Sequence, residues 1–213
     1  MFTGIIEAVG TVKSIEKKGL FGKIVVGCAL DLSGIRVGDS IAVNGSCLTV
    51  TELSSGSFSA DISAETFRVT TLGELSSGAR VNIEPALTLS RPLGGHMVSG
   101  HVDGVGVIRK KVERGASANL EVSCPPELMG QIVKKGSVAV DGISLTVAEL
   151  SSDGFMVAVI PHTLRKTTLP GKREGARVNI ETDVIGKYVE KHFASGKQSI
   201  TEDFLSEHGF FRK

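Results

Sequence analysis

The sequence SIAVNGSCLTVTELSS at residues 40–55 recurs as SVAVDGISLTVAELSS at residues 137–152. The match continues without a gap over residues 40–84 and 137–181 with about half of the positions identical, far above chance. Each copy places Asn-Gly or Asp-Gly between alternating β-branched runs, which is the strongest short-range signal for a two-residue type I′ hairpin. The chain therefore carries one β-rich module twice.

The repeat also sets the expected domain organisation. Residues 1–4, MFTG, align with residues 97–100, MVSG, and further alternating runs are separated by Gly, Ser and Lys clusters. Such spacing predicts a small closed barrel in each copy, because closure removes exposed strand edges. The segment 89–95 interrupts the periodicity. We therefore expect an N-terminal barrel over residues 1–96 and a C-terminal barrel over residues 97–184.

The tail, residues 185–213, has a helical pattern and no counterpart after the first copy. One face of the predicted helix carries Ile185, Tyr188, Val189, His192 and Phe193. A second short helix would have Ser199 as N-cap, Glu202 completing a capping box and Gly209 as its stop. The apolar stripe needs a partner surface, either the chain's own barrel or another copy of the chain.

Charge, cysteine content and hydropathy exclude several classes of function. Charged residues make up 22% of the chain and the formal net charge is +1, which argues against binding to polyanions. The three cysteines, Cys28, Cys47 and Cys124, are widely spaced and form no C-x-x-C pair, as expected of reduced thiols. Because no export signal or membrane-length apolar run is present, we expect a cytoplasmic protein.

The two copies differ at chemically significant positions. Cys47 aligns with Ser144, Phe2 with Val98, Ile5 with His101, Glu65 with His162, and Ala86 with Asp183. Similar pockets with unlike polar groups suit two similar molecules in different roles, or one working site beside one that has drifted. The strand-to-loop junctions at Glu65 and His162 favour a ligand rim, although solvated loops have the same pattern.

Two of these residues have plainer interpretations. An isolated cysteine such as Cys47 is more often a small buried apolar residue than a nucleophile. His96 and His101 lack the i, i+4 spacing of a helical metal pair, and the run around them, GGHMVSGHVDG, is typical of extended structure. We therefore expect no metal site.

Four strings in this order resemble one protein family. They are MFTGIIE at 1–7, NGSCLTV at 44–50, GGHMVSGHVDG at 94–104 and KKGSVAVDGISLTV at 134–147. Together they resemble riboflavin synthase of the alpha-chain type over essentially the whole chain. The resemblance implies an all-β fold of tandem duplicated six-stranded Greek-key β-barrels with a C-terminal α-helix. It also implies a homotrimer held partly by that helix, with active sites between the N-terminal barrel of one subunit and the C-terminal barrel of a neighbour.

The resemblance further implies the reaction. Each barrel would bind one molecule of 6,7-dimethyl-8-ribityllumazine. One molecule would donate a four-carbon unit to the other, giving riboflavin and 5-amino-6-ribitylaminouracil without a metal or other cofactor. It leaves an association with lumazine synthase open.

Catalytic roles are implied for Ser40, Cys47, His101, Thr146 and Asp183. The C7 methyl of the lumazine is acidic, so a base of modest strength such as His101, assisted by Thr146, would suffice to remove its proton. Ser40, Cys47 or a water they position would supply or orient the nucleophile that adds to the second molecule. Asp183 would assist proton movement or orient a ring amine.

Substrate contacts are implied along several segments, with Phe2 stacking on or walling the pteridine ring. The expected substrate-binding residues are Phe2, Gly4, Ile5, Ile6, Cys47, Leu48, Thr49, Asp61, Ile62, Ser63, Ala64, Glu65, Thr66, Gly100, His101, Val102, Lys135, Ser144, Leu145, Thr146, Ala158, Val159, Ile160, Pro161, His162 and Thr163.

Two other classes of protein compete with this interpretation. The lumazine proteins keep a double barrel but bind a fluorescent ligand as an optical antenna, without catalysis. Flavin-dependent reductases also use small six-stranded barrels, but they need a nucleotide-binding domain with a Gly-rich turn between strand and helix, which this sequence lacks.

Overall fold

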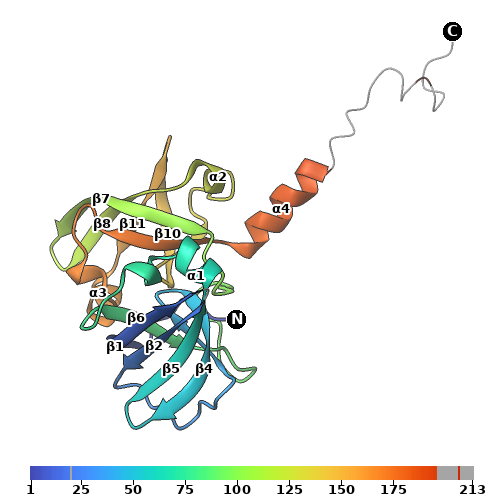
Figure 1. Ribbon diagram of the computed structural model, residues 1–213. Coiled ribbons are helices and arrows are strands. Elements are labelled where there is room, and N and C mark those ends of the chain that lie inside the picture. The colour runs from blue at the N-terminus through green and yellow to red at the C-terminus, as the bar shows by residue number, and fades with distance from the viewer. Residues whose placement is uncertain (20, 196–205, 207–213) are drawn as a thin grey trace.

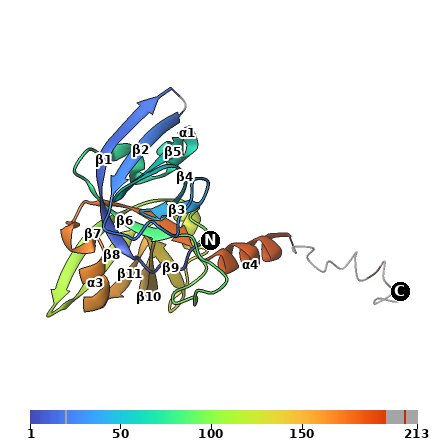
Figure 2. The same cartoon turned by 90° about the horizontal axis from the view of Figure 1, so that it is seen from below.

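The computed structural model describes residues 1–19, 21–195 and 206, and this part of the chain forms two closed antiparallel barrels. The barrels lie one against the other, and the last described helix projects away from them (Figures 1 and 2). The first barrel contains β1 (Ala8–Lys18), β2 (Phe21–Gly27), β3 (Ser40–Val43), β4 (Ser46–Ser54), β5 (Ser57–Ser63) and β6 (Arg80–Pro85). The second contains β7 (Gly104–Arg114), β8 (Ser117–Ser123), β9 (Ser137–Val140), β10 (Ile143–Ser151), β11 (Gly154–Val159) and β12 (Arg177–Thr182).

Both barrels have the same strand order. In the first it is β1-β2-β5-β4-β3-β6, and the second repeats it with β7 to β12 in the corresponding places. Three strands joined by consecutive hairpins, β3, β4 and β5, are followed in the chain by β6, which returns to pair with β3, and this is the Greek-key arrangement. The predicted pair of six-stranded Greek-key barrels is confirmed.

Short helices connect the strands, and one longer helix follows the last strand. They are α1 (Ala64–Val69), the 3-10 helix Thr71–Glu74, α2 (Pro126–Met129), α3 (Pro161–Lys166), the 3-10 helix Leu169–Gly171 and α4 (Val184–Ser195). The junctions after β5 and β11, interpreted from the sequence as loops, are thus the starts of α1 and α3. Ser63 explains the first, because its hydroxyl accepts the Thr66 N–H as an N-cap, and Pro161 explains the second as a first-turn proline.

The hairpins predicted at Asn44-Gly45 and Asp141-Gly142 are present. All four turn residues have positive φ, at 45° and 80° in the first copy and 46° and 78° in the second. This is the geometry of type I′ turns, whose twist matches that of the flanking strands.

Alternation along the strands divides each barrel into a core and an outer surface. Leu48 and Val50 on β4 point into the first core, and Leu145 and Val147 on β10 into the second. Bulges at the same places in both copies, at Val50/Glu52 and Val147/Glu149, help the strands curve into closure.

The two hairpin turns meet back to back at the centre of the molecule. A Cβ on Gly45 would lie 2.7 Å from the Gly142 backbone nitrogen, so only glycine permits this approach. Around the turns, Asn82 on β6 donates from Nδ2 to Asp141 O and accepts the Thr168 N–H. These bonds join the first barrel to the second.

Asn179 on β12 makes the equivalent bonds in the opposite direction. It donates from Nδ2 to Asn44 O and accepts the Thr71 N–H. Both asparagines are 1% exposed. Each therefore satisfies buried backbone groups of the other barrel, and neither barrel can shift without breaking bonds.

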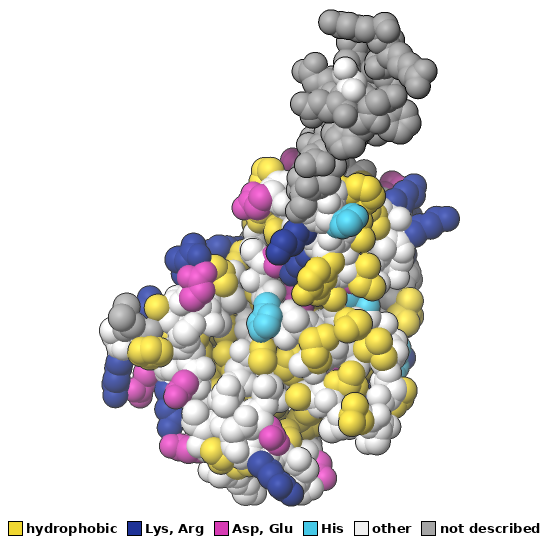
Figure 3. All heavy atoms as spheres, turned by 90° about the vertical axis from the view of Figure 1, so that its right-hand side faces the viewer, with side chains coloured by type: hydrophobic (Ala, Val, Ile, Leu, Met, Phe, Trp, Pro, Cys, Tyr) yellow, Lys and Arg dark blue, Asp and Glu magenta, His cyan; other side chains and the backbone are white. Residues whose placement is uncertain are grey.

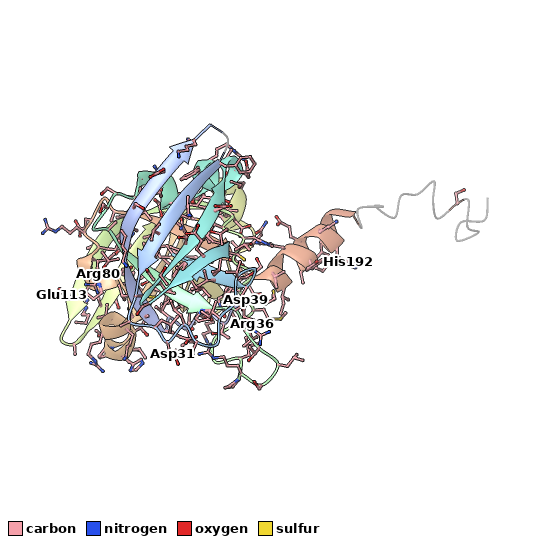
Figure 4. The ribbon with its side chains drawn as sticks, turned by 60° about the horizontal axis from the view of Figure 1, so that its bottom comes forward. Asp31, Arg36, Asp39, Arg80, Glu113 and His192 are labelled. Carbon is pink, nitrogen blue, oxygen red and sulfur yellow. The ribbon has the colours of Figure 1, made fainter. Side chains whose placement is uncertain are left out.

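Helix α4 leaves the second barrel with much of its apolar face uncovered. Ile185, Tyr188 and Phe193 are 62%, 71% and 71% exposed in the single chain. Figure 4 shows His192 on the part of this helix that stands away from the barrels, whereas Arg36 and Asp39 lie in the connection between β2 and β3. The helix is present as predicted, but it does not use its own barrel to cover the stripe.

The second helix expected from Ser199, Glu202 and Gly209 lies outside the described residues. Across the part of the chain that is described, no helix is long and apolar enough to span a membrane.

Replacing either central asparagine should weaken the fold. Asn82→Ala and Asn179→Ala each leave a buried N–H and a buried C=O without a partner, which should lower the free energy of unfolding by about 3 kcal/mol. Urea unfolding followed by circular dichroism measures this, with Ser55→Ala in an exposed turn as the control. Unfolding midpoints equal to that of the control would contradict the bridging role.

Candidate functional site

The opening segments of the two modules cross between the barrels. Phe2 and Val98 form an isolated antiparallel bridge, with N–H to O distances of 2.7 and 3.1 Å. Beyond it, the Ser144 N–H donates to Gly4 O, and the Cys47 N–H donates to Gly100 O, each at 2.8 Å. Each opening therefore ends against the β-hairpin of the other barrel.

Two buried glutamates hold these openings. Glu84 accepts from the backbone N–H groups of Thr3 and Gly4 at 2.7 and 3.0 Å, and Glu181 accepts from those of Ser99 and Gly100 at 2.6 and 3.0 Å. Burial raises the pKa of both carboxyl groups, and the hydrogen-bond donors oppose that rise.

A cavity of about 440 Å³ lies beside Cys47, between α1 and the second opening. This volume is within the range of small-molecule sites. Its lining comprises Ser46, Cys47, Glu65, Thr66, Arg68, Val69, Thr70, Gly100, His101, Val102 and Asp103. A thiol, an imidazole and two carboxyl groups thus line one concave surface.

Electrostatics at the cavity rim are set by α1. Arg68 Nε donates to Glu65 Oε2 at 2.9 Å, one turn along the helix, and the guanidinium lowers the pKa of the Glu65 carboxyl. His101 is exposed, and its backbone N–H donates to Ser99 Oγ at 3.2 Å. The imidazole is therefore accessible to a ligand, while a hydrogen bond holds the backbone of His101 in place.

The equivalent place on the second barrel has different side chains. Ser144 stands where the first barrel has Cys47, and His96 Nδ1 lies 2.7 Å from Ser144 Oγ. His96 is 8% exposed, and its Nε2 has no partner among the described residues. Burial lowers the pKa of this imidazole, and the Asp183 carboxylate opposes the shift, so His96 favours the neutral form.

Lys135 occupies a strained position just before β9. Its φ is 67°, whereas the aligned residue of the first copy is Gly38, with φ 95°, and both backbone N–H groups make the same hydrogen bond, to Val147 O and Val50 O. A left-handed conformation is costly for any residue with a Cβ. An exposed lysine retained there is a candidate for function rather than for stability.

The other predicted catalytic residues are distributed over both barrels. Ser40 begins β3 and pairs with Thr49, whereas Thr146 on β10 pairs with Ser137 and is exposed. Cys47 and His101 share the cavity, but Thr146 does not line it. Asp183 follows β12, where its Oδ1 accepts the Ile185 N–H at the start of α4.

Strand alternation divides the predicted substrate-binding residues into two groups. Thr49, Asp61, Ser63, Ala158 and Ile160 are on the outer surface, together with Thr146. Ile6, Leu48, Ile62, Leu145 and Val159 instead belong to the barrel cores. These core side chains are buried in the single chain, with Ile6 and Leu145 the most exposed at 9% and 7%.

The stacking role expected of Phe2 needs correction. The side chain is 0% exposed and packs with Ala42, Val98 and Ala139 between the barrels. A Cβ on Gly100 would lie 2.8 Å from the Phe2 ring, so the ring supports the second opening from beneath. With no exposed surface, it cannot wall a ligand in this arrangement.

Sequence reasoning missed several residues of the site. Arg68, Thr70 and Asp103 line the cavity, and His96 was considered only as a metal ligand. The sequence patterns used above do not single out Glu84 and Glu181. The two glutamates align with each other in the repeat, and the residues that follow them, Pro85 and Thr182, differ. Their position at the end of a conspicuous VNIE string in each copy was the available signal.

Comparison with known proteins identifies the family. The lumazine binding domain model matches the chain twice, over residues 3–86 and 99–183. The chain is 43% identical to riboflavin synthase of Actinobacillus pleuropneumoniae over 99% of this chain and 100% of that protein. The chain belongs to the riboflavin synthase family. Within this family it is also 43% identical to the enzyme of Bacillus subtilis and 44% identical to that of Mycobacterium tuberculosis, the latter over 90% of this chain and 97% of that protein.

Solved structures with the same fold support the family assignment. The structure of LumP complexed with 6,7-dimethyl-8-(1'-D-ribityl) lumazine matches with a TM-score of 0.77 and 26% identity, and the LumP complex with riboflavin with 0.80 and 27%. Each match covers 85% of this chain and 99% of LumP. This riboflavin synthase family member thus shares its double barrel with proteins that hold a lumazine or a flavin.

Acidification should affect the fold through His96. The unfolded chain takes up a proton near pH 6.5, whereas the buried His96 does so only at lower pH, so the free energy of unfolding falls as pH decreases below 6.5. His96→Gln should lack this part of the decline. Urea unfolding of both proteins between pH 7.5 and pH 5 compares the slopes, and superimposable slopes would rule out the buried neutral state.

Proposed function

We propose that this chain makes riboflavin by transferring a four-carbon unit between two molecules of 6,7-dimethyl-8-ribityllumazine. The second product is 5-amino-6-ribitylaminouracil, and the two products together contain the atoms of the two substrates, so the reaction needs no external oxidant or reductant. The observation that carries the proposal is full-length similarity to riboflavin synthases, in a chain where Cys47, His101, Thr146 and Asp183 are all present.

The unlike side chains of the two barrels support unlike roles for the two substrates. Beside the first barrel, the Cys47 thiol and the His101 imidazole face one cavity of about 440 Å³. His101 is exposed there and suits removal of the acidic C7 methyl proton. Cys47, or a water that it orients with Ser40, suits nucleophilic addition to C7 of the second lumazine molecule.

The second barrel supplies hydroxyl and cationic groups instead. Ser144, held by neutral His96, and Thr146 offer hydrogen bonds to a ring, and Lys135 offers a charge for a developing anion. Asp183 would orient a ring amine or move a proton. Because Thr146 does not line the cavity that His101 shares with Cys47, we infer that the two cooperate where the first barrel of one subunit faces the second barrel of a neighbour.

A homotrimer assembled through α4 would bring such barrels together. The apolar side chains Ile185, Val189 and Phe193 line a groove of about 390 Å³ between α4 and residues 130–137, where Ser137 and Asp183 also lie. Figure 3 looks onto this side of the molecule, where hydrophobic side chains gather below the helix. A second copy of the chain would cover them and complete a site that includes Asp183.

A cytoplasmic location is part of the proposal, whereas an association with lumazine synthase stays open. The three cysteines are all unpaired, in agreement with a reducing compartment.

The similarity to LumP supports the alternative function, a non-catalytic protein that holds a lumazine or flavin. The higher identity to riboflavin synthases, 43% against 26% and 27% for the LumP structures, favours catalysis over simple binding.

Incubation with the lumazine alone should generate riboflavin's longer-wavelength absorption. His101→Gln should lower the initial rate about 100-fold, because loss of a general base costs roughly that factor, while ligand binding persists. Absorbance and chromatography of the products measure both proteins. A wild-type protein that binds the lumazine and leaves its spectrum unchanged for hours would be a binding protein.

Deleting residues 185–213 should convert trimers into monomers, because the exposed stripe of α4 is then absent. Light scattering coupled to size exclusion reports the mass, and circular dichroism checks that the barrels remain folded. Lys13→Ala on β1, outside the helical tail, serves as the control and should stay trimeric. An intact trimer after truncation would refute assembly through the tail.

A further inference from the structure

The site beside each barrel is completed by a segment of the opposite module. In the first barrel Cys47 meets Gly100, and in the second Ser144 meets Gly4. A Cβ on Gly100 would lie 2.5 Å from Cys47 Cβ, and one on Gly4 would lie 2.6 Å from Ser144 Cβ. Both glycines have positive φ, at 81° and 74°. These close contacts leave little freedom, so whatever holds the openings also determines the shape of the sites.

A chain of hydrogen bonds connects the second barrel to the first site. Glu181 on β12 accepts from the Ser99 N–H and hydroxyl through Oε1, at 2.6 and 2.7 Å, and from the Gly100 N–H through Oε2, at 3.0 Å. The Ser99 hydroxyl oxygen in turn accepts the His101 N–H at 3.2 Å. Three donors on one carboxylate fix the backbone that carries His101 into the cavity beside Cys47.

The first barrel repeats this chain toward the second site. Glu84 on β6 accepts from the Thr3 N–H and hydroxyl, both at 2.7 Å, and from the Gly4 N–H at 3.0 Å. The Thr3 hydroxyl oxygen accepts the Ile5 N–H at 3.2 Å. The two glutamates are each 3% exposed, so they act on a ligand only through the residues that they hold.

We propose that Glu181 is the positioning residue of the Cys47 site on the first barrel and that Glu84 is the positioning residue of the Ser144 site on the second. Each barrel thus orders the site on its partner barrel within the same chain. The effect on turnover rests on the proposed function, whereas the effect on local order does not. The repeat supplies a matched control, since each glutamate serves as the comparison for the other.

Amide hydrogen exchange resolved by residue tests the crossed arrangement. Glu181→Gln keeps the shape of the side chain but replaces one acceptor oxygen by a donor NH2 group. Exchange at Gly100 and Cys47 should accelerate on the order of tenfold. The Gly100 amide loses its charged acceptor, and the Cys47 amide donates to the Gly100 carbonyl, which is then held less firmly. Gly4 and Ser144 should change by less than about twofold. Glu84→Gln should give the reverse pattern.

A milder pair of variants covers the case in which a glutamine variant does not fold. Ser99→Ala removes the hydroxyl that accepts the His101 N–H, and Thr3→Val removes the one that accepts the Ile5 N–H. Exchange should accelerate at His101 only in the first variant and at Ile5 only in the second.

Steady-state kinetics with the lumazine provides the functional comparison. Glu181→Gln should lower kcat about tenfold with a smaller change in KM, because misplacement of His101 affects the reacting geometry more than binding. A wild-type protein that forms no riboflavin would end the proposed function and leave the exchange test intact. Equal acceleration at both sites in one variant, or no acceleration in a folded variant, would overturn the crossed positioning.

Discussion

The side chains of Asn82 and Asn179 join the two barrels, and the remaining geometry depends on that connection. Each amide satisfies one buried N–H and one buried C=O of the opposite barrel, next to two glycine turns in close contact. Loss of alignment would leave several polar groups buried without partners, which is costly in the interior of a protein. The barrels consequently behave as one unit, and the crossed openings have fixed surfaces to rest on.

The backbone of this unit is nearly two-fold symmetric, whereas its chemistry is not. Beside the central turns, Asp141 is fully buried and pairs with Lys172 Nζ at 2.8 Å, while the first copy has Asn44 and Leu75 at the aligned positions. Burial raises the pKa of Asp141, and the lysine ammonium opposes that rise. Removing the lysine alone would strand a buried carboxyl group. The copies have therefore diverged at their contact as well as at their pockets.

The repeat made the fold accessible to prediction, because the same alternation and the same turn signal occurred twice. Asn44-Gly45 and Asp141-Gly142 were correctly predicted as hairpins, since positive φ at two successive positions limits the choice of residues. The candidate site was predicted by segment rather than by side chain. Residue types alone do not show that Leu48 points inward while Thr49 points outward until the register of β4 is known.

Other features depend on contacts between distant parts of the chain. Internal similarity shows that Gly4 corresponds to Gly100, but not that each lies against the hairpin of the opposite copy. Phe2 illustrates the same limit, because an aromatic residue near a chain opening suits a ligand wall and a buried support equally well. The short helices after β5 and β11 depend on single capping or first-turn residues, which a strand-rich pattern conceals.

The left-handed lysine before β9 bears on any effort to make this protein more robust. A stability screen would favour glycine at Lys135, as in the first copy, because glycine relieves backbone strain there. The same exchange would remove the ammonium group from the surface of the second barrel. Selection for heat resistance alone would thus erase one of the differences that distinguish the two halves, and would move the chain back toward two identical barrels.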